Sequence, residues 1–370
     1  AVVAFPRWAR ADGAPPAGTG TIVLLHLVGG NDGLNTVVPY AHPRYRRLRP
    51  TLAVEPATVV KVDDEVGLHP ALRPLAAQLD RGQIAIVNGV GYPEPDYSHF
   101  RATEIWYTAE PRGAPTDGWI GRALEARERA SPVRAIAIAT EQPLSFAGSA
   151  TGVVTLTDFS SLRVPRELDD TARLYREYRG LEGARADVGR AGAEALDVAG
   201  RFASLQPAAG PFAGRLGEDL RKVVALLSAG LDLEAIHLGF GGFDTHANQA
   251  GAHAGLLGQL ATNLNVFQDR LDALGLSEKV VTVVFSEFGR RAEENASGGT
   301  DHGSAGPMFV LGRGVRPGLH GAYPDLDDLD GGNLRFTTDF RSVYAAVLSR
   351  ALAVEPGPIL GDFRPLELFR

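Results

Sequence analysis

The chain has 370 residues, of which 44% are hydrophobic and 22% charged, a balance that excludes a disordered or fibrous protein. Its 37 basic and 44 acidic residues give a net charge of −7 without a polybasic run, which argues against nucleic acid as a partner. Apolar runs are too short to span a bilayer, and the absence of cysteine excludes disulfides and thiolate metal sites. Any metal must therefore bind histidine nitrogens and carboxylate oxygens.

The first twenty residues are rich in alanine, proline and glycine and show no periodicity. Ala9-Arg10-Ala11 has the small-x-small pattern of an export cleavage site. We interpret residues 1–20 as a flexible remnant of an export segment, with a plain flexible N-terminus as the alternative. Residues 21–370 are expected to form a single domain.

Two strand–helix units open this domain. Thr21–Val28 is a continuous apolar run, which indicates a strand covered on both faces in a parallel sheet. After the amphipathic segment Pro70–Asp80, a second strand is predicted at Gln83–Asn88 and a helix at Ser98–Thr108.

The middle of the chain, about residues 111–205, is less regular and is interpreted as an inserted cap. It contains a predicted strand, Val133–Ala139, and a predicted long helix, Leu168–Leu205. Regular alternation then resumes with helix Phe212–Ser228, strand Glu234–Phe240, helix Ala247–Leu274, strands Lys279–Phe285 and Met308–Leu311, and helix Asp339–Leu352. The pattern predicts a doubly wound, mostly parallel α/β sheet with helices on both faces, whose ligands bind at the carboxyl ends of the strands.

Polar residues follow the first two strands. Asp32 stands in a glycine-rich turn after the first strand, where it is either a metal ligand or a turn-forming aspartate. Ser98 begins the helix after the second strand, where it is either a nucleophile beside the free N–H groups of a helix N-terminus or a simple N-cap. His99 is left out of the predicted site because adjacent residues on a helix diverge.

More candidate ligands follow the later strands. Asp244 and His246 lie two apart, a spacing at which both side chains of an extended segment reach one ion. Glu287 follows the next strand, and Asp301 and His302 follow a glycine-rich loop. Such clustering of aspartate, glutamate and histidine at one sheet edge predicts a metal site, with isolated caps as the alternative at each position.

Five motifs in this order resemble the DUF1501 family, a bacterial group of unknown function usually exported with a twin-arginine leader. They are Gly29–Pro39, Tyr97–Arg101, Gly242–His246, Ser286–Arg290 and Thr300–Gly303. Through that family the chain is similar, more remotely, to the alkaline phosphatase and sulfatase superfamily. The resemblance implies an alkaline-phosphatase-like α/β fold, one or two divalent ions at strand ends, and a nucleophile at a helix N-terminus.

On that resemblance Asp32, Asp244, His246, Glu287 and His302 match metal ligands, and Ser98 takes the place of the nucleophile. Asp301 is a ligand or a partner that orients His302. The Asp244–His246 spacing is shorter than in the superfamily, and Phe288 stands where it has a histidine. One metal site is therefore expected, with the second in doubt.

The implied function is that of an exported, periplasmic or extracellular metal-dependent hydrolase of phosphate or sulfate esters, with a serine or a metal-bound hydroxide as nucleophile. Arg101 and Arg290 are candidate clamps for the anionic substrate, or else ordinary surface charges. Zinc or manganese is the expected metal, with calcium as an alternative. The sequence around Ser98 disfavours a formylglycine sulfatase. The alternative function is a non-catalytic surface or polysaccharide-binding protein that keeps the hydrolase fold.

Overall fold

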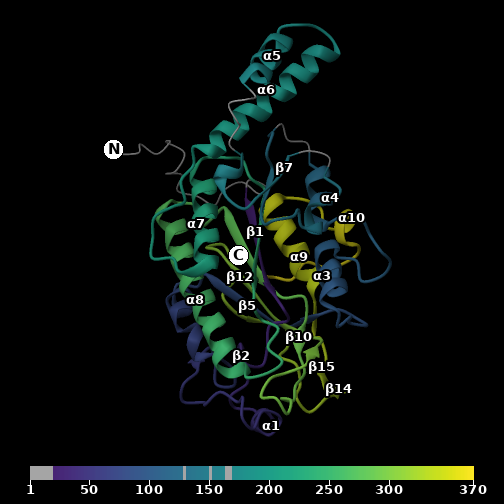
Figure 1. Ribbon diagram of the computed structural model, residues 1–370. Coiled ribbons are helices and arrows are strands. Elements are labelled where there is room, and N and C mark those ends of the chain that lie inside the picture. Colours follow the sequence, from purple (N-terminus) through teal and green to yellow (C-terminus); the bar gives the residue numbers. More distant parts are fainter. Residues whose placement is uncertain (1–19, 128–130, 150–151, 163–168) are drawn as a thin grey trace.

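The computed structural model describes residues 20–127, 131–149, 152–162 and 169–370 of the chain (Figure 1). The predicted export remnant lies, except for Gly20, outside the described residues. Within the described ranges, no helix combines the length and apolarity needed to cross a membrane.

A central sheet organises the described part of the chain, with strands in the order β13-β5-β12-β9-β1-β8-β6-β7 and β16 paired to β5. Strand β1 pairs in parallel with both β8 and β9, and β12 is antiparallel to β9 and β5. The sheet strands are β1 (Thr21–Val28), β5 (Ile84–Gly91), β6 (Ala135–Ile138), β7 (Val153–Leu156), β8 (Ala235–Gly241), β9 (Val280–Phe285), β12 (Gly306–Leu311), β13 (Gly318–His320) and β16 (Thr338–Asp339). The predicted mostly parallel α/β class is confirmed.

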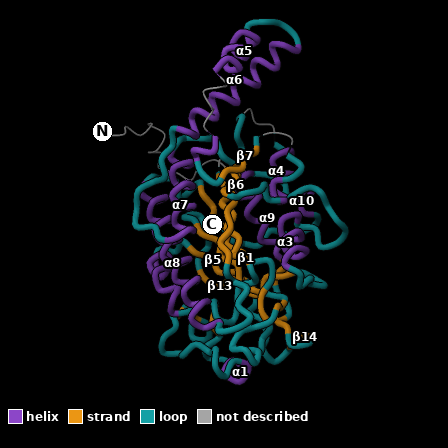
Figure 2. Tube along the Cα trace, viewed as in Figure 1, coloured by secondary structure: helices purple, strands orange, loops and turns teal. Residues whose placement is uncertain are grey.

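Helices cover both faces of this sheet, as Figure 2 shows. They are α1 (Pro43–Leu48), α2 (Ala76–Asp80), α3 (His99–Thr108), α4 (Trp119–Glu125), α5 (Asp169–Arg179), α6 (Ala184–Ala203), α7 (Gly214–Ser228), α8 (Gln249–Ala273), α9 (Phe340–Val347) and α10 (Gly357–Leu360). Short 3₁₀ segments lie at Pro70–Leu75, Leu144–Phe146 and Phe159–Leu162, and a π-helical turn, Leu348–Leu352, continues α9.

Alternation along β1 divides the core between the two faces. Val23, Leu25 and Leu27 pack with α7 and α8, whereas Ile22 and Leu24 pack with α3, α4 and α9. Because side chains two apart share a face of a strand, His26 also points toward α3. This places a buried histidine in a mainly apolar layer.

Small sheets lie apart from the central one. They pair β10 (Gly289–Arg290) with β11 (His302–Gly303), β14 (Leu329–Asp330) with β15 (Asn333–Leu334), and β2 (Val37–Val38), β4 (Gly67–Leu68) and β3 (Val60–Lys61) with one another. The β10–β11 pair brings the segment after β9 beside His302, which matters for the site below.

The region interpreted as an insertion contributes to the central sheet. Strand β6 falls within the predicted Val133–Ala139 and, with β7, extends the sheet beyond β8. The predicted helix Leu168–Leu205 is two helices instead, with Leu168 itself outside the described residues. Gly180 follows α5, and Gly183, at φ 64°, precedes α6. Glycines destabilise a helix interior and permit this reversal, so α5 and α6 form a hairpin that projects from the body (Figure 1).

Candidate metal centre

The carboxyl ends of β1, β8 and β9 meet at one edge of the sheet, and the segments that leave them carry the polar residues predicted from sequence. Asp244 and His246 follow β8, Glu287 follows β9, and His302 lies on β11. His99 begins α3, the helix that follows β5, and reaches the same place. The predicted location of the site agrees with this arrangement.

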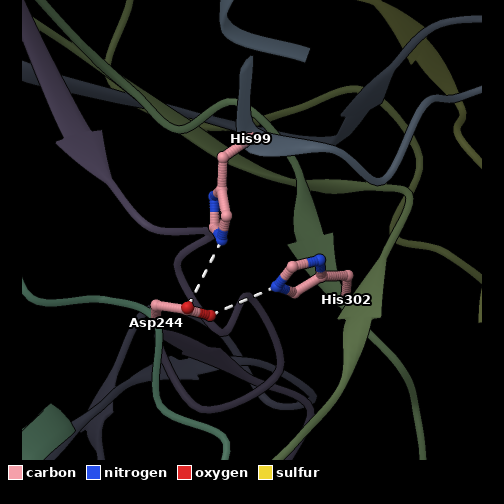
Figure 3. A group of neighbouring side chains, drawn as sticks. All are labelled: His99, Asp244 and His302. Atoms are coloured by element: carbon pink, nitrogen blue, oxygen red, sulfur yellow. Dashed lines mark hydrogen bonds and ion pairs between the residues drawn. The ribbon is translucent and has the colours of Figure 1, made fainter. Parts of the chain in front are cut away.

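Three side chains converge at its centre: His99, Asp244 and His302 (Figure 3). His99 Nε2 lies 3.4 Å from Asp244 Oδ2, and His302 Nε2 lies 3.2 Å from Asp244 Oδ1. His246 joins them, because its Nε2 lies 2.9 Å from Asp244 Oδ1 and 3.0 Å from His302 Nε2. We call these four residues the His–Asp cluster.

The other nitrogen of each imidazole faces an oxygen atom. His99 Nδ1 lies 2.8 Å from Glu287 Oε1, His302 Nδ1 lies 2.7 Å from the carbonyl oxygen of Tyr97, and His246 Nδ1 lies 3.4 Å from Asp301 Oδ1. Carbonyl and ionised carboxylate oxygens only accept hydrogen bonds, so Nδ1 must carry the proton in each ring. In a neutral imidazole, Nε2 then presents a lone pair.

Lone pairs consequently face the Asp244 carboxylate, which is itself an acceptor. His99 Nε2 is shielded from solvent and has no hydrogen-bond partner among the described residues. A buried acceptor without a donor is costly, and a cation at this point would satisfy all of these groups together. Ligands about 2.1 Å from a zinc ion in a tetrahedral site stand about 3.4 Å apart, close to the observed separations. The donor set therefore fits a divalent metal ion.

Asp244 is held as a carboxylate. Burial alone would raise its pKa, but the hydrogen bond and the charge of Arg290 outweigh burial and lower the pKa to about 2. The side chain keeps 47% of its exposure, so the cluster is open to small molecules. An ionised, accessible carboxylate is what a metal ligand requires.

Glu287 supports His99 from behind rather than joining the cluster. The side chain is fully buried and accepts from the backbone N–H of Gly29 at 2.8 Å. Burial by itself would raise the pKa of Glu287, but the hydrogen bond and charge of His26, together with the hydrogen bond of His99, hold it well below its usual range. It orients an imidazole in the way carboxylates do behind metal-bound histidines.

Asp301 contacts a different histidine from the one expected. Its carboxylate faces His246, not His302, and also accepts from Asn295 Nδ2 at 3.0 Å. The alternative in which Asp301 orients a histidine therefore fits the geometry, with His246 in the place of His302.

Arg290 is buried, and its donors are directed to protein oxygens and, from Nη1, to His246 Nε2 at 3.3 Å. The Nε–H donates to Gly30 O at 2.7 Å, Nη1 to Thr300 O at 2.8 Å, and Nη2 to Gly29 O at 2.6 Å and Asp244 Oδ1 at 2.7 Å. This differs from the predicted substrate clamp, because a guanidinium engaged in this way has no free fork for an anion. Arg290 instead ties together the loops that follow β1, β8 and β9.

Asp32 lies apart from the cluster. Arg49 donates to both of its carboxylate oxygens, at 2.6 and 3.0 Å, and the Gln249 amide also donates to it. The side chains of Asp32 and Arg49 are both fully buried. Burial would raise the pKa of Asp32, but the charge and hydrogen bonds of Arg49 lower it to about 2. The structure thus gives Asp32 a buried ion pair in place of the expected metal ligation.

Ser98 occupies the predicted position at the N-terminus of α3. It is exposed and makes no side-chain capping bond. It stands between Tyr97, whose carbonyl faces His302, and His99. Arg101, by contrast, donates to the carbonyls of Pro111 and Gly113, so it points to the loop after α3 and not to the cluster.

His99 is the member of the cluster that sequence reasoning excluded. It was excluded because the side chains of neighbouring helical residues point in different directions. Ser98, however, is the N-cap and has extended backbone angles, φ −81° and ψ 125°, so Ser98 and His99 are not two neighbours within a helix. The position of His99, directly after a predicted N-cap serine at a strand end, could have indicated that it belongs to the site. Phe288, which stands where the resemblance implied a histidine, packs against the rings of His99 and His302 at 4.8 and 4.5 Å between centroids.

Comparison with known proteins agrees with the motif resemblance. A family model described as "Protein of unknown function (DUF1501)" matches residues 20–333. The chain belongs to the DUF1501 family. No curated protein matches it.

Solved structures similar to this DUF1501 protein share little sequence with it. The lipoteichoic acid synthase LtaP from Listeria monocytogenes is 9% identical, with a TM-score of 0.42 over 92% of this chain and 74% of that one. The PsFucS1 sulfatase from Pseudoalteromonas sp. is 9% identical, with a TM-score of 0.42 over 94% and 70%. The phosphonate monoester hydrolase SpPMH from Silicibacter pomeroyi is 10% identical, with a TM-score of 0.40 over 94% and 76%. Because the TM-scores lie below 0.5, function has to be argued from the site.

Proposed function

We propose that this protein is an exported, metal-dependent hydrolase of phosphate or sulfate esters. The observation that carries the proposal is the convergence of imidazole Nε2 atoms on the Asp244 carboxylate, with each Nδ1 held by an oxygen atom. Three imidazoles and one carboxylate favour zinc or manganese over calcium, which prefers oxygen ligands. Export to the periplasm or beyond is part of the proposal and follows from the twin-arginine leader usual in the family.

The residues around the cluster suit an anionic substrate. The first-turn N–H groups of α3 have no intrahelical acceptor, and the Ser98 side chain does not cap them. They lie beside His99 at the positive end of the helix dipole and are available to ester oxygens. Because Arg101 and Arg290 already donate to acceptors within the protein, these backbone donors take the role that the two arginines were expected to have.

Ser98 is the proposed nucleophile. Its hydroxyl is exposed and directly precedes a proposed metal ligand. A divalent ion held by the cluster would lower the pKa of an attacking hydroxyl and neutralise charge on the ester oxygens. The serine would attack phosphorus or sulfur, the ester oxygen would leave with a proton, and water would then release the inorganic anion and regenerate the serine.

The first test is metal content by elemental mass spectrometry on the purified protein. We expect about one equivalent of a transition metal, and its loss in His99→Ala and in the double variant Asp244→Ala/His246→Ala. A matched control is His42→Ala, because His42 lies with Asp325 and Asp327 in the other histidine–carboxylate group of the described residues. This control should retain the metal.

The second test is turnover of 4-nitrophenyl phosphate, bis(4-nitrophenyl) phosphate and 4-nitrophenyl sulfate by the metal-loaded protein. We expect Ser98→Ala to lose activity while it keeps its metal. Metal without turnover of any ester would favour the non-catalytic surface or polysaccharide-binding protein. An absence of metal after incubation with zinc, manganese and calcium would refute the hydrolase proposal.

A further inference from the structure

A continuous line of polar contacts runs from the His–Asp cluster into the core. Glu287 Oε2 lies 3.0 Å from His26 Nε2, and His26 Nδ1 lies 2.8 Å from the Tyr107 hydroxyl. The same hydroxyl lies 3.2 Å from His237 Nε2, and His237 Nδ1 lies 3.0 Å from Ser145 Oγ. We call Ser145, His237, Tyr107, His26 and Glu287 the polar line.

The polar line crosses an apolar layer. His26 and His237 lie on β1 and β8, on the face that packs against α3, and are 1% and 3% exposed. Aromatic side chains surround them: His26 stacks on Phe285 at 4.9 Å, and Phe146 lies edge-on to His237 at 5.9 Å. Burying such polar groups is costly unless they are hydrogen-bonded, and apolar side chains would fill this layer more stably. The cost of burying these polar groups indicates a role beyond packing.

The protonation states of two members suit a fixed line. Burial, followed by the charge of His26, lowers the pKa of His237 to about 3, so this imidazole stays neutral. Burial and the charge of Glu287 raise the pKa of Tyr107 above its usual range, so its hydroxyl keeps the proton. The Tyr107 hydroxyl can therefore donate one hydrogen bond and accept another.

The polar line also closes a ring through α3. His99 and Tyr107 lie eight residues apart on this helix, which separates them by about 12 Å along its axis. Glu287 and His26 join the two from the sheet side. The helix is thereby fixed at both ends, which sets its rotation and hence the direction of the His99 ring.

We propose that the Tyr107 hydroxyl is a positioning group for the metal centre, acting through His26 and Glu287 to hold the His99 imidazole with Nε2 toward Asp244. This inference rests on the proposed metal-dependent function and assigns it residues that do not touch the metal. Loss of the hydroxyl leaves His26 without its Nδ1 partner, frees the carboxylate of Glu287 to shift, and loosens the ring it holds.

The test compares Tyr107→Phe with Tyr344→Phe. Tyr344 is the control because it is a tyrosine of the same layer, more deeply buried than Tyr107, and its hydroxyl donates to the Trp106 carbonyl at 3.2 Å, outside the polar line. Zinc affinity is measured by competition with a chelator. We expect Tyr107→Phe to bind zinc about tenfold more weakly and Tyr344→Phe to match the wild type, since loss of a group that orients a metal-bound histidine typically costs at least this factor.

A second readout uses the metal-free protein. Nitrogen-15 spectra of histidine-labelled protein at pH 9, where free imidazole is neutral, report which ring nitrogen carries the proton. We expect one His99 signal set with the proton on Nδ1 in the wild type and in Tyr344→Phe, and a mixture of tautomers in Tyr107→Phe.

The two readouts separate failure of this inference from failure of the proposed function. If the wild type binds no metal, the hydrolase proposal falls, and the His99 spectra still decide whether Tyr107 positions the ring. If zinc affinity and the His99 spectrum are unchanged in Tyr107→Phe, the positioning role is refuted. Equal weakening of zinc affinity in both tyrosine variants would also refute it, because the effect would then follow from general loss of packing.

Discussion

At the scale of one residue, the role of Arg290 can be tested: it either binds the substrate or supports the fold. Its guanidinium donates to carbonyl groups after β1, after β8 at Phe243, and at Thr300, and lysine lacks the planar fork needed to reach them all. We expect Arg290→Lys to lower the free energy of unfolding by about 3 kcal/mol or more, since each buried acceptor left without a donor costs about 1–3 kcal/mol. Urea unfolding of the metal-free protein measures this.

Arg101→Lys is the matched comparison for that variant. The Arg101 guanidinium also donates to two carbonyls, but its side chain is 24% exposed, so water can replace the lost bonds. We expect a loss below about 1 kcal/mol. If Arg290→Lys left the stability unchanged and weakened substrate binding, Arg290 would be a substrate-binding residue after all.

Asp32 gives a pH dependence with a definite sign. Its pKa in the folded protein is about 2, below the ordinary value of 3.8, so ionisation of Asp32 stabilises the fold. That contribution is fully present above pH 4 and is lost as the pH falls from about 4 through 2. We expect the stability difference between wild type and Asp32→Asn to shrink by about 2 kcal/mol between pH 5 and pH 2. A difference independent of pH in urea unfolding would contradict the buried ion pair with Arg49.

At the scale of elements, the turn after β1 sets the spacing of the cluster. Gly29 has φ 119°, and a Cβ there would overlap the backbone nitrogen of Asp244 and lie 2.9 Å from the carbonyl carbon of Phe243. We expect Gly29→Ala to displace the Asp244 loop and weaken zinc binding at least tenfold, besides lowering stability. Zinc competition and urea unfolding measure the two effects.

Gly113→Ala isolates the backbone part of that effect. Gly113 has φ 83°, but a Cβ there would meet nothing within 4 Å, so this variant pays for the left-handed conformation alone, about 1 kcal/mol. Its zinc affinity should match the wild type. Wild-type zinc binding in Gly29→Ala would show that the turn does not position Asp244.

The sequence predicted elements well where burial alone determines them. Thr21–Val28 agrees with β1 at both ends, because a strand covered on both faces is mostly apolar. The prediction from sequence was wrong or incomplete where a local break in a helix, or pairing between distant segments, determines the element. The glycines between α5 and α6 look tolerable within a helical pattern, and two-residue strands such as β10 and β11 form only through tertiary pairing.

The whole molecule explains why the site was predicted only in part. Parallel topology brings the ends of β1, β8 and β9 together, so the segment with Asp244 and His246 could be placed beside the one that follows β9. The β10–β11 pair then brings His302 to the same edge. Which residue at each end faces the cluster depends on side-chain partners elsewhere. Asp32 turns to Arg49, seventeen residues later in the chain, and no local pattern reveals that ion pair.

Metal binding should stabilise the molecule as a whole, because the cluster joins α3, the segment after β8 and β11, which are far apart in the sequence. An ion that binds only the folded state adds about 2.7 kcal/mol to the free energy of unfolding at a hundredfold excess over its dissociation constant. We expect zinc to give this increase in urea unfolding and a chelator to reverse it. His42→Ala should respond like the wild type, whereas Asp244→Ala/His246→Ala should not respond. Equal stabilisation of the double variant would mean that zinc binds the folded protein at another place.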